Sequence, residues 1–213
     1  MSKERGFFVT FEGGDGVGKS TQIERLAQTL KNRGEDVVVT REPGGSTGAE
    51  EIRALLVKGD SARWSAMTEL LLVMAARRDH WEKTIEPALK KGAIVLCDRF
   101  FDSTMAYQGL AGGLGEAHVT TAQELAIGDV RPDVTFVLTL PDDLGLARTG
   151  ARDGDETRFE EKGQDFQDRV GAAFLAIAKG NPERCVVIDA SDEIEVISTR
   201  ILGEFDDRRG AHG

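Results

Sequence analysis

Short runs of hydrophobic residues alternate with segments of helical periodicity along most of the chain. Runs rich in β-branched and aromatic residues predict strands at 7–11, 36–40, 93–97, 134–140 and 184–188. Hydrophobic residues recur with helical spacing near 19–33, 49–57, 65–91, 116–130, 142–150, 161–180 and 192–206. This alternation predicts an α/β fold, in which a mostly parallel five-stranded sheet has helices on both faces.

The strand runs are almost continuously apolar, as expected for strands that are buried on both sides. No internal repeat and no Pro- or Ser-rich linker divides the sequence. A chain of 213 residues, 40% of them hydrophobic, can bury a full core without metal or disulfide. We therefore expect a single domain over 1–213, with the last few residues disordered.

Composition excludes several classes of partner. A net charge of -10 argues against nucleic acid as a partner, because such binders present a basic surface. The longest apolar run, 70–76, is too short to cross a bilayer, and the N-terminus lacks the apolar stretch of a secretory signal. Cys97 and Cys185 lie within apolar strand runs and are expected to be reduced core thiols. We expect a cytoplasmic protein with no membrane partner.

A glycine-rich segment follows the first predicted strand and opens the first predicted helix. It matches G-x-x-x-x-G-K-[ST] and consists of Gly13, Gly14, Asp15, Gly16, Val17, Gly18, Lys19 and Ser20, with Thr21 next. Its backbone N–H groups can surround a phosphate, while Lys19 reaches the β- and γ-phosphates and Ser20 offers a hydroxyl to Mg²⁺. The segment therefore predicts a P-loop that binds ATP.

The P-loop alone leaves the fate of the nucleotide open. A GTPase switch is expected to carry a base-reading N-K-x-D, and that tetrapeptide does not occur here. This favours an enzyme with a second substrate over a regulatory nucleotide-binding protein. The third strand run ends in Asp98 and Arg99, where a carboxylate can hold Mg²⁺ and an arginine can clamp a phosphoryl group. An ordinary surface ion pair is the alternative reading of these two residues.

Six segments in order and register resemble bacterial thymidylate kinase over nearly the whole chain. They are FEGGDGVGKST, TREPGGSTGAEEIRALL, AARRDH, LCDRFFDSTMAYQG, RPDVTFVL and VIDAS. The resemblance implies a P-loop NTPase-type three-layer α/β/α fold with a mobile lid. It also implies Mg²⁺-dependent transfer of the ATP γ-phosphoryl group to dTMP, giving dTDP and ADP, by a homodimer.

The resemblance assigns the phosphate and sugar side of the acceptor site. Asp15 corresponds to a carboxylate near the 3′-hydroxyl of the deoxyribose, and Arg99 to the arginine that grips the acceptor phosphate. Arg53 matches another position near that phosphate. Tyr107 falls where a ribose 2′-hydroxyl would lie, which favours a deoxynucleotide. Without the aligned set, Arg53 would be interpreted as a solvated helix residue and Tyr107 as a core aromatic.

The resemblance also assigns the base pocket. Glu42 and Pro43 match the loop that lines it, Arg77 matches the arginine that binds a thymine carbonyl, and Thr104 and Gln108 match positions at the base edge and sugar. An aromatic that stacks on thymine is usual four residues before this arginine, but Val73 is found here. Base stacking is worth about 1–3 kcal/mol. This departure leaves open another acceptor, such as dUMP or a modified pyrimidine nucleotide.

A charged segment at 151–163 matches the lid of the family. One branch of the family has an arginine in the P-loop where this chain has Gly16, and the other branch supplies that charge from the lid. Arg152 and Arg158 are therefore the candidate catalytic arginines, with Arg148 in reserve.

Overall fold

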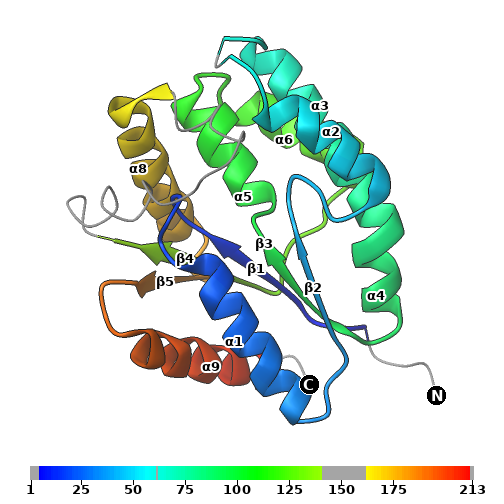
Figure 1. Cartoon of the computed structure of the whole chain (residues 1–213), viewed down its shortest axis with the longest axis vertical. Helices are drawn as coiled ribbons and strands as arrows, with labels where there is room; N and C mark the ends of the chain where they lie inside the picture. The colour runs from blue at the N-terminus through cyan, green and yellow to red at the C-terminus, as the bar shows by residue number, and fades with distance from the viewer. Residues whose placement is uncertain (1–4, 61, 141–161, 212–213) are drawn as a thin grey trace.

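The computed structural model describes residues 5–60, 62–140 and 162–211. Its centre is a five-stranded sheet with the order β2-β3-β1-β4-β5 (Figure 1). All neighbouring strands in it are parallel. The strands are β1 (Phe8–Glu12), β2 (Val37–Arg41), β3 (Ile94–Asp98), β4 (Val134–Thr139) and β5 (Cys185–Asp189). Each lies within one residue of its predicted run, which confirms the predicted α/β sheet.

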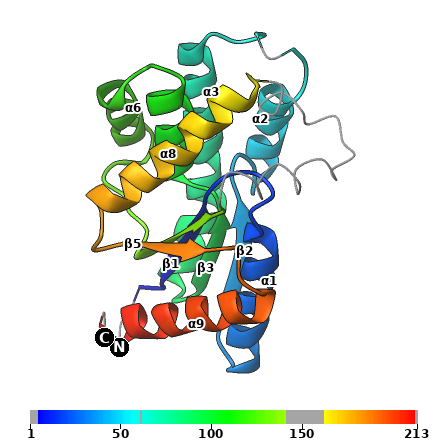
Figure 2. The same cartoon turned by 90° about the vertical axis from the view of Figure 1, so that its left-hand side faces the viewer.

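Helices cover both faces of this sheet. Their bounds are α1 (Lys19–Asn32), α2 (Thr47–Val57), α3 (Ala66–His80), η1 (Trp81–Ile85), α4 (Glu86–Lys90), α5 (Phe101–Thr104), η2 (Met105–Ala111), α6 (Glu116–Ile127), α8 (Gln164–Gly180) and α9 (Ile194–Gly210). Helices α1 and α9 pack on one face, and Figure 2 shows α9 and α8 on opposite sides of β5. Helices α3, α4 and α6 pack on the other face.

Side chains along the central strand β1 point alternately to the two faces of the sheet and so join two separate cores. Val9 and Phe11 join the core beneath α1 and α9, whereas Phe8 joins the core beneath α3 and α4. All five residues of β1 are buried, as expected for the central strand of a sheet covered on both faces. The carboxyl ends of β1 and β3 lie side by side, since Phe11 pairs with Asp98.

The helical predictions differ from the structure in several places. The segment at 65–91 is helical, but a π-helical turn over Trp81–Ile85 separates α3 from α4. The helical stretch of α5 and η2 was not predicted, because Met105, Ala106, Tyr107, Gln108 and Gly109 are all buried and show no amphipathic period. Helix α9 continues to Gly210, beyond the predicted end at 206.

The predicted helix at 142–150 and most of the predicted lid lie outside the described residues. None of the helices that the structure describes is long and apolar enough to cross a membrane. Cys97 and Cys185 are buried and free, which confirms the prediction of core thiols.

Candidate active site

The P-loop connects β1 to α1 across the carboxyl edge of the sheet. Gly13 has φ +129°, and a Cβ there would lie 2.2 Å from the carbonyl oxygen of Leu138, so only glycine fits. Lys19 is 7% exposed, and its Nζ donates to the carbonyl oxygens of Gly14, at 2.7 Å, and Gly13, at 3.2 Å. Burial, and next the positive charge of Arg99, lower the pKa of Lys19 to about 8. The ammonium therefore lies over the cradle that a phosphate would enter.

Ser20 and Asp98 meet where α1 begins beside the end of β3. The Ser20 hydroxyl donates to Asp98 Oδ2 at 3.2 Å. The other carboxylate oxygen, Asp98 Oδ1, is buried and has no hydrogen-bond partner. A hydroxyl, a carboxylate and nucleotide phosphates suit a Mg²⁺ ion, which binds to few protein ligands. No group of three or more His, Cys, Asp or Glu side chains suited to a metal ion occurs in the described ranges.

Arg99 brings together the residues that were predicted on the phosphate and sugar side. Its Nη2 donates to Asp15 Oδ1 at 2.9 Å, and its Nη1 donates to the Ser103 hydroxyl at 3.0 Å. The guanidinium lies 5.3 Å from the centre of the Tyr107 ring, and the Tyr107 hydroxyl lies 3.5 Å from Asp15 Oδ2. Asp15 of the P-loop, Arg99 and Tyr107, from three separate segments, therefore form one cluster.

Arg77 is the centre of a second polar cluster, which joins residues predicted to line the base pocket. It is 1% exposed, and its Nε donates to Glu42 Oε2 at 2.7 Å. Its Nη1 donates to Gln123 Oε1 and its Nη2 to the Thr104 hydroxyl, both at 2.9 Å. Glu42 Oε1 lies 3.1 Å from Nδ1 of His80. Arg77 of α3 is thus held by side chains of α5, α6 and one loop rather than solvated.

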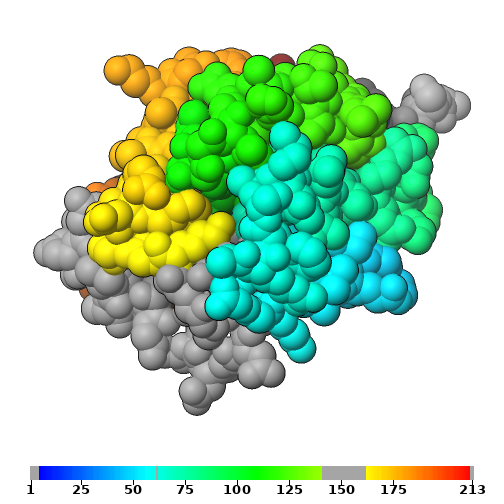
Figure 3. Space-filling view, turned by 90° about the horizontal axis from the view of Figure 1, so that it is seen from above, coloured from blue at the N-terminus to red at the C-terminus, as the bar shows by residue number. Residues whose placement is uncertain are grey.

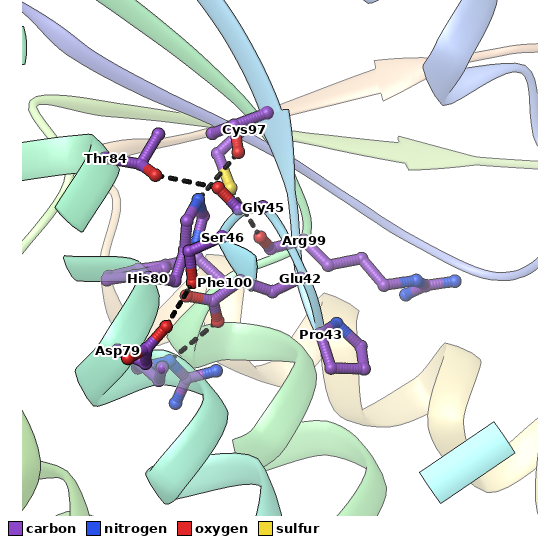
Figure 4. A network of polar contacts seen from close by, with 12 residues as sticks. Glu42, Pro43, Gly45, Ser46, Asp79, His80, Thr84, Cys97, Arg99 and Phe100 are labelled. Carbon is purple, nitrogen blue, oxygen red and sulfur yellow. Dashed lines mark hydrogen bonds and ion pairs between the residues drawn. The ribbon is translucent and has the colours of Figure 1, made fainter. Parts of the chain in front are cut away.

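The loop after β2 is tied to this cluster, as Figure 4 shows. A Cβ at Gly45, where φ is +83°, would lie 2.3 Å from His80 Nε2, so the loop packs closely against α3. Ser46 donates to Asp79 Oδ2 at 2.6 Å, and Thr84 donates to the Gly45 carbonyl at 2.7 Å. The Arg99 guanidinium points away from this network in the same view.

The remaining predicted residues lie around these clusters. Arg53 Nη1 donates to the Pro43 carbonyl at 2.8 Å, so it contacts the loop that it was predicted to adjoin, and the Glu42–Pro43 peptide is cis. Gln108 donates to Glu69 Oε1 at 2.7 Å. Val73 is buried on α3, one helical turn before Arg77. Arg148, Arg152 and Arg158 lie outside the described residues.

Several buried polar residues that sequence reasoning missed hold this site. Glu12, Glu69, His80 and Gln123 are 0–2% exposed. Glu12 ends an apolar strand directly before the P-loop, and Gln123 interrupts the apolar face of a predicted helix. A polar residue at a position whose neighbours predict burial was the available signal.

Comparisons with known proteins match nearly the whole chain to one family. The family model of thymidylate kinase matches residues 11–201. A thymidylate kinase of Caulobacter vibrioides is 54% identical over 197 residues, covering 92% of this chain and 94% of that protein. One from Ruegeria pomeroyi is 50% identical, covering 92% of each. The crystal structure of thymidylate kinase from Ehrlichia chaffeensis has a TM-score of 0.77 at 36% identity, covering 94% of this chain and 99% of that one.

Proposed function

The chain belongs to the thymidylate kinase family, and we propose that the clusters around Lys19, Arg99 and Arg77 carry out the reaction of that family. The protein is an ATP-dependent phosphotransferase that converts dTMP to dTDP and releases ADP. The comparisons give no support to another acceptor or to a regulatory protein without activity.

The observation that carries the assignment is the position of Arg99 across the sheet edge from the P-loop. Lys19 follows β1 and Arg99 follows β3, and these strands are neighbours. A phosphoryl group that passes between them meets a cation on the donor side and another on the acceptor side. Phosphoryl transfer needs mainly positioning and charge neutralisation, so these cations supply what the reaction requires.

Selection of dTMP is assigned to the buried cluster and to Tyr107. Arg77 has its Nε and both terminal nitrogens in contact with side chains, which fixes the plane of the guanidinium that would meet the thymine carbonyl. Thr104 lies within that set, at the edge of the proposed base pocket. The Tyr107 ring packs against Phe166 and Phe174 of α8 and cannot move away from an added 2′-hydroxyl without disturbing them.

Mg²⁺ is the proposed metal, with Ser20 and Asp98 as its protein ligands or as partners of its waters. The buried Asp98 oxygen without a partner fits this role, since such oxygens are normally hydrogen-bonded. When bound, the ion neutralises charge on the transferred phosphates. Arg152 and Arg158 remain the proposed lid arginines, because Gly16 leaves the P-loop without one.

A homodimer is proposed from the exposed apolar side chains of α2, α3 and α6. Leu71 of α3 is 58% exposed and Leu125 of α6 is 87% exposed. Leu55 of α2 and Met67 of α3 are also exposed. These three helices pack together, and Figure 3 shows the cyan and green segments side by side on one face. A second copy of the chain would cover this apolar surface.

Coupled measurement of ADP release tests the assignment. We expect dTMP to give the highest kcat/KM in a panel with dUMP, dCMP and dAMP, and Arg99→Ala to raise the KM for dTMP. Preference for dCMP, or an Arg99→Ala protein with an unchanged KM, would contradict these roles.

A further inference from the structure

Glu12 is a buried carboxyl at the junction of β1 and the P-loop. It is 0% exposed, and the next residue begins the phosphate cradle. Its Oε1 accepts hydrogen bonds from the backbone N–H of Phe100, at 2.8 Å, and of Ser103, at 3.3 Å. Its Oε2 lies 2.5 Å from the Ser103 hydroxyl. Both oxygens are therefore directed at the turn that follows β3, and Glu12 presents no surface to a substrate.

That turn contains the unusual backbone of Arg99. Its φ is +67°, a left-handed conformation that costs a residue with a side chain about 1–2 kcal/mol. The Arg99 N–H donates to the Phe11 carbonyl at 2.9 Å, and the Cys97 thiol donates to the Arg99 carbonyl at 3.0 Å. Glu12 then holds the N–H of the following residue. The conformation of Arg99 is thus fixed from both sides, mainly by strand β1.

A second connection reaches the Arg99 side chain. The Ser103 hydroxyl that contacts Glu12 also accepts from Arg99 Nη1 at 3.0 Å, while Nη2 donates to Asp15. The guanidinium is therefore held at both terminal nitrogens. The contact between Glu12 and Ser103 is a hydrogen bond in either charge state of the carboxyl, since the carboxylate accepts from the hydroxyl and the neutral acid donates to it. In both cases the Ser103 oxygen keeps a lone pair for Arg99.

We propose that Glu12 is a positioning residue, which sets the Arg99 guanidinium for the acceptor phosphate through the backbone of residues 99–103 and through the Ser103 hydroxyl. This inference rests on the proposed role of Arg99. Glu12 acts by two routes, through the backbone N–H groups of Phe100 and Ser103 and through the Ser103 hydroxyl, so variants can separate them.

Steady-state kinetics of the full-length protein, with one substrate saturating at a time, tests this role. Ser103→Ala removes the side-chain contact but keeps the backbone N–H, and should raise the KM for dTMP about tenfold, as for one lost hydrogen bond to a charged group. Glu12→Ala also releases the backbone of the turn and should raise the KM for dTMP further. The KM for ATP should stay within about twofold in both. Glu12→Gln, which keeps an oxygen for the two N–H groups and can donate to Ser103, should recover most of what Glu12→Ala loses.

Thr10→Val is the matched control. Thr10 is a buried residue of the same strand, and its hydroxyl pairs with that of Thr135 at 2.8 Å. Loss of this bond should lower the urea midpoint of unfolding and leave the ratio of the two KM values unchanged. A structural role for Glu12 alone would give the same pattern as Thr10→Val.

A double-mutant cycle identifies the residue through which Ser103 acts. In the Arg99→Ala background, Ser103→Ala should have no further effect on the KM for dTMP. If Arg99→Ala raises this KM while Ser103→Ala and Glu12→Ala do not, the inference is overturned and the role of Arg99 stands. If Arg99→Ala itself leaves the KM unchanged, the proposed role of Arg99 is wrong and the inference falls with it. If Glu12→Ala does not fold, Ser103→Ala still tests the route through the Ser103 hydroxyl.

Discussion

Arg77 and Glu42 form an ion pair that is almost completely withdrawn from water. Their atoms Nε and Oε2 are 2.7 Å apart, and the two side chains are 1% and 4% exposed. Glu42 comes from the loop after β2 and Arg77 from α3, so the pair joins two segments that border the proposed base pocket. A buried pair of this kind is most sensitive to loss of one partner, because the other charge then remains in a site of low polarity.

Arg77→Ala should therefore lower both stability and acceptor binding. We expect the free energy of unfolding to fall by about 3–5 kcal/mol, because Glu42 is left without its guanidinium partner. Urea unfolding monitored by circular dichroism measures this loss. Arg78→Ala is the control on the same helix. Arg78 is half exposed, pairs with Glu82 one turn away and donates to the Ala126 carbonyl at 2.9 Å, so its loss should cost only about 1–2 kcal/mol. Equal losses in the two variants would contradict the prediction.

Lys19→Ala should abolish most of the turnover and leave the chain folded. The ammonium neutralises charge that develops as the phosphoryl group moves, and loss of one such contact is worth roughly 3 kcal/mol, or a hundredfold or more in kcat. Stopped-flow or coupled assays give kcat, and circular dichroism checks the fold. Lys31→Ala, at the other end of α1, should keep the kcat of the parent protein. Near-normal turnover of a folded Lys19→Ala protein would remove this residue from the mechanism.

The Tyr107 ring should make the enzyme prefer a deoxyribonucleotide. An added 2′-hydroxyl must displace a ring that is 7% exposed and packed against α8. We expect kcat/KM for dTMP to exceed that of its ribonucleotide counterpart by at least about tenfold, and Tyr107→Ala to narrow this ratio. Equal values for the two nucleotides in the unmutated enzyme would contradict the placement of Tyr107.

Val73→Phe should tighten binding of dTMP if the pocket has kept its thymine specificity. The side chain lies on α3 one turn before Arg77, where a ring could stack on the base, and stacking is worth about 1–3 kcal/mol. The expected result is a lower KM for dTMP with little change in kcat. Val73→Ile, which adds bulk without an aromatic face, is the control. A higher KM in the phenylalanine variant would mean that neighbouring side chains leave no room for the ring.

Glu12 should make the stability of the protein decrease as the pH rises. Burial, and next the negative charge of Asp102, raise the pKa of the Glu12 carboxyl from 4.5 to about 8. Between these two values the folded chain keeps a proton that the unfolded chain has released, so the free energy of unfolding falls by about 1.4 kcal/mol per pH unit from this group. Below pH 4.5 both states are protonated, and above pH 8 the loss is complete.

Comparison with Glu12→Gln isolates this contribution, since glutamine does not titrate. Urea unfolding of both proteins at pH 5, 6, 7, 8 and 9 should show the variant gaining stability relative to the parent up to about pH 8 and then levelling. A difference that is constant over this range would contradict the raised pKa.

The sequence predicts best those features that a repeating pattern encodes. The run at 7–11 predicts β1 to within one residue because Val9 and Phe11 face one core while Phe8 faces the other, and both faces require apolar side chains. The P-loop is predictable because its glycines and Lys19 follow a fixed spacing. Resemblance to a family, rather than periodicity, is what singles out Arg77 and Tyr107.

Features that depend on contacts between distant segments were not predicted from the sequence. The stretch over α5 and η2 is buried on nearly all sides, so it lacks the polar face by which an amphipathic helix is identified. Glu12 contacts residues about ninety positions later in the chain, and Gln123 of α6 contacts Arg77 of the neighbouring helix α3. No local pattern specifies such pairs, because each residue forms a hydrogen bond with a polar group that is distant in the sequence and comes near only in the folded chain.

The strand order has a consequence for synthesis of the chain on the ribosome. β1 is made first but lies in the middle of the sheet, and its neighbours β3 and β4 begin at Ile94 and Val134. At about 5–20 residues per second, the nascent β1 waits on the order of ten seconds before either neighbour has been translated. During that interval β1 has neither of the strands that it pairs with in the finished sheet. The strand that carries the P-loop is therefore the segment for which a chaperone holding the nascent chain would matter most.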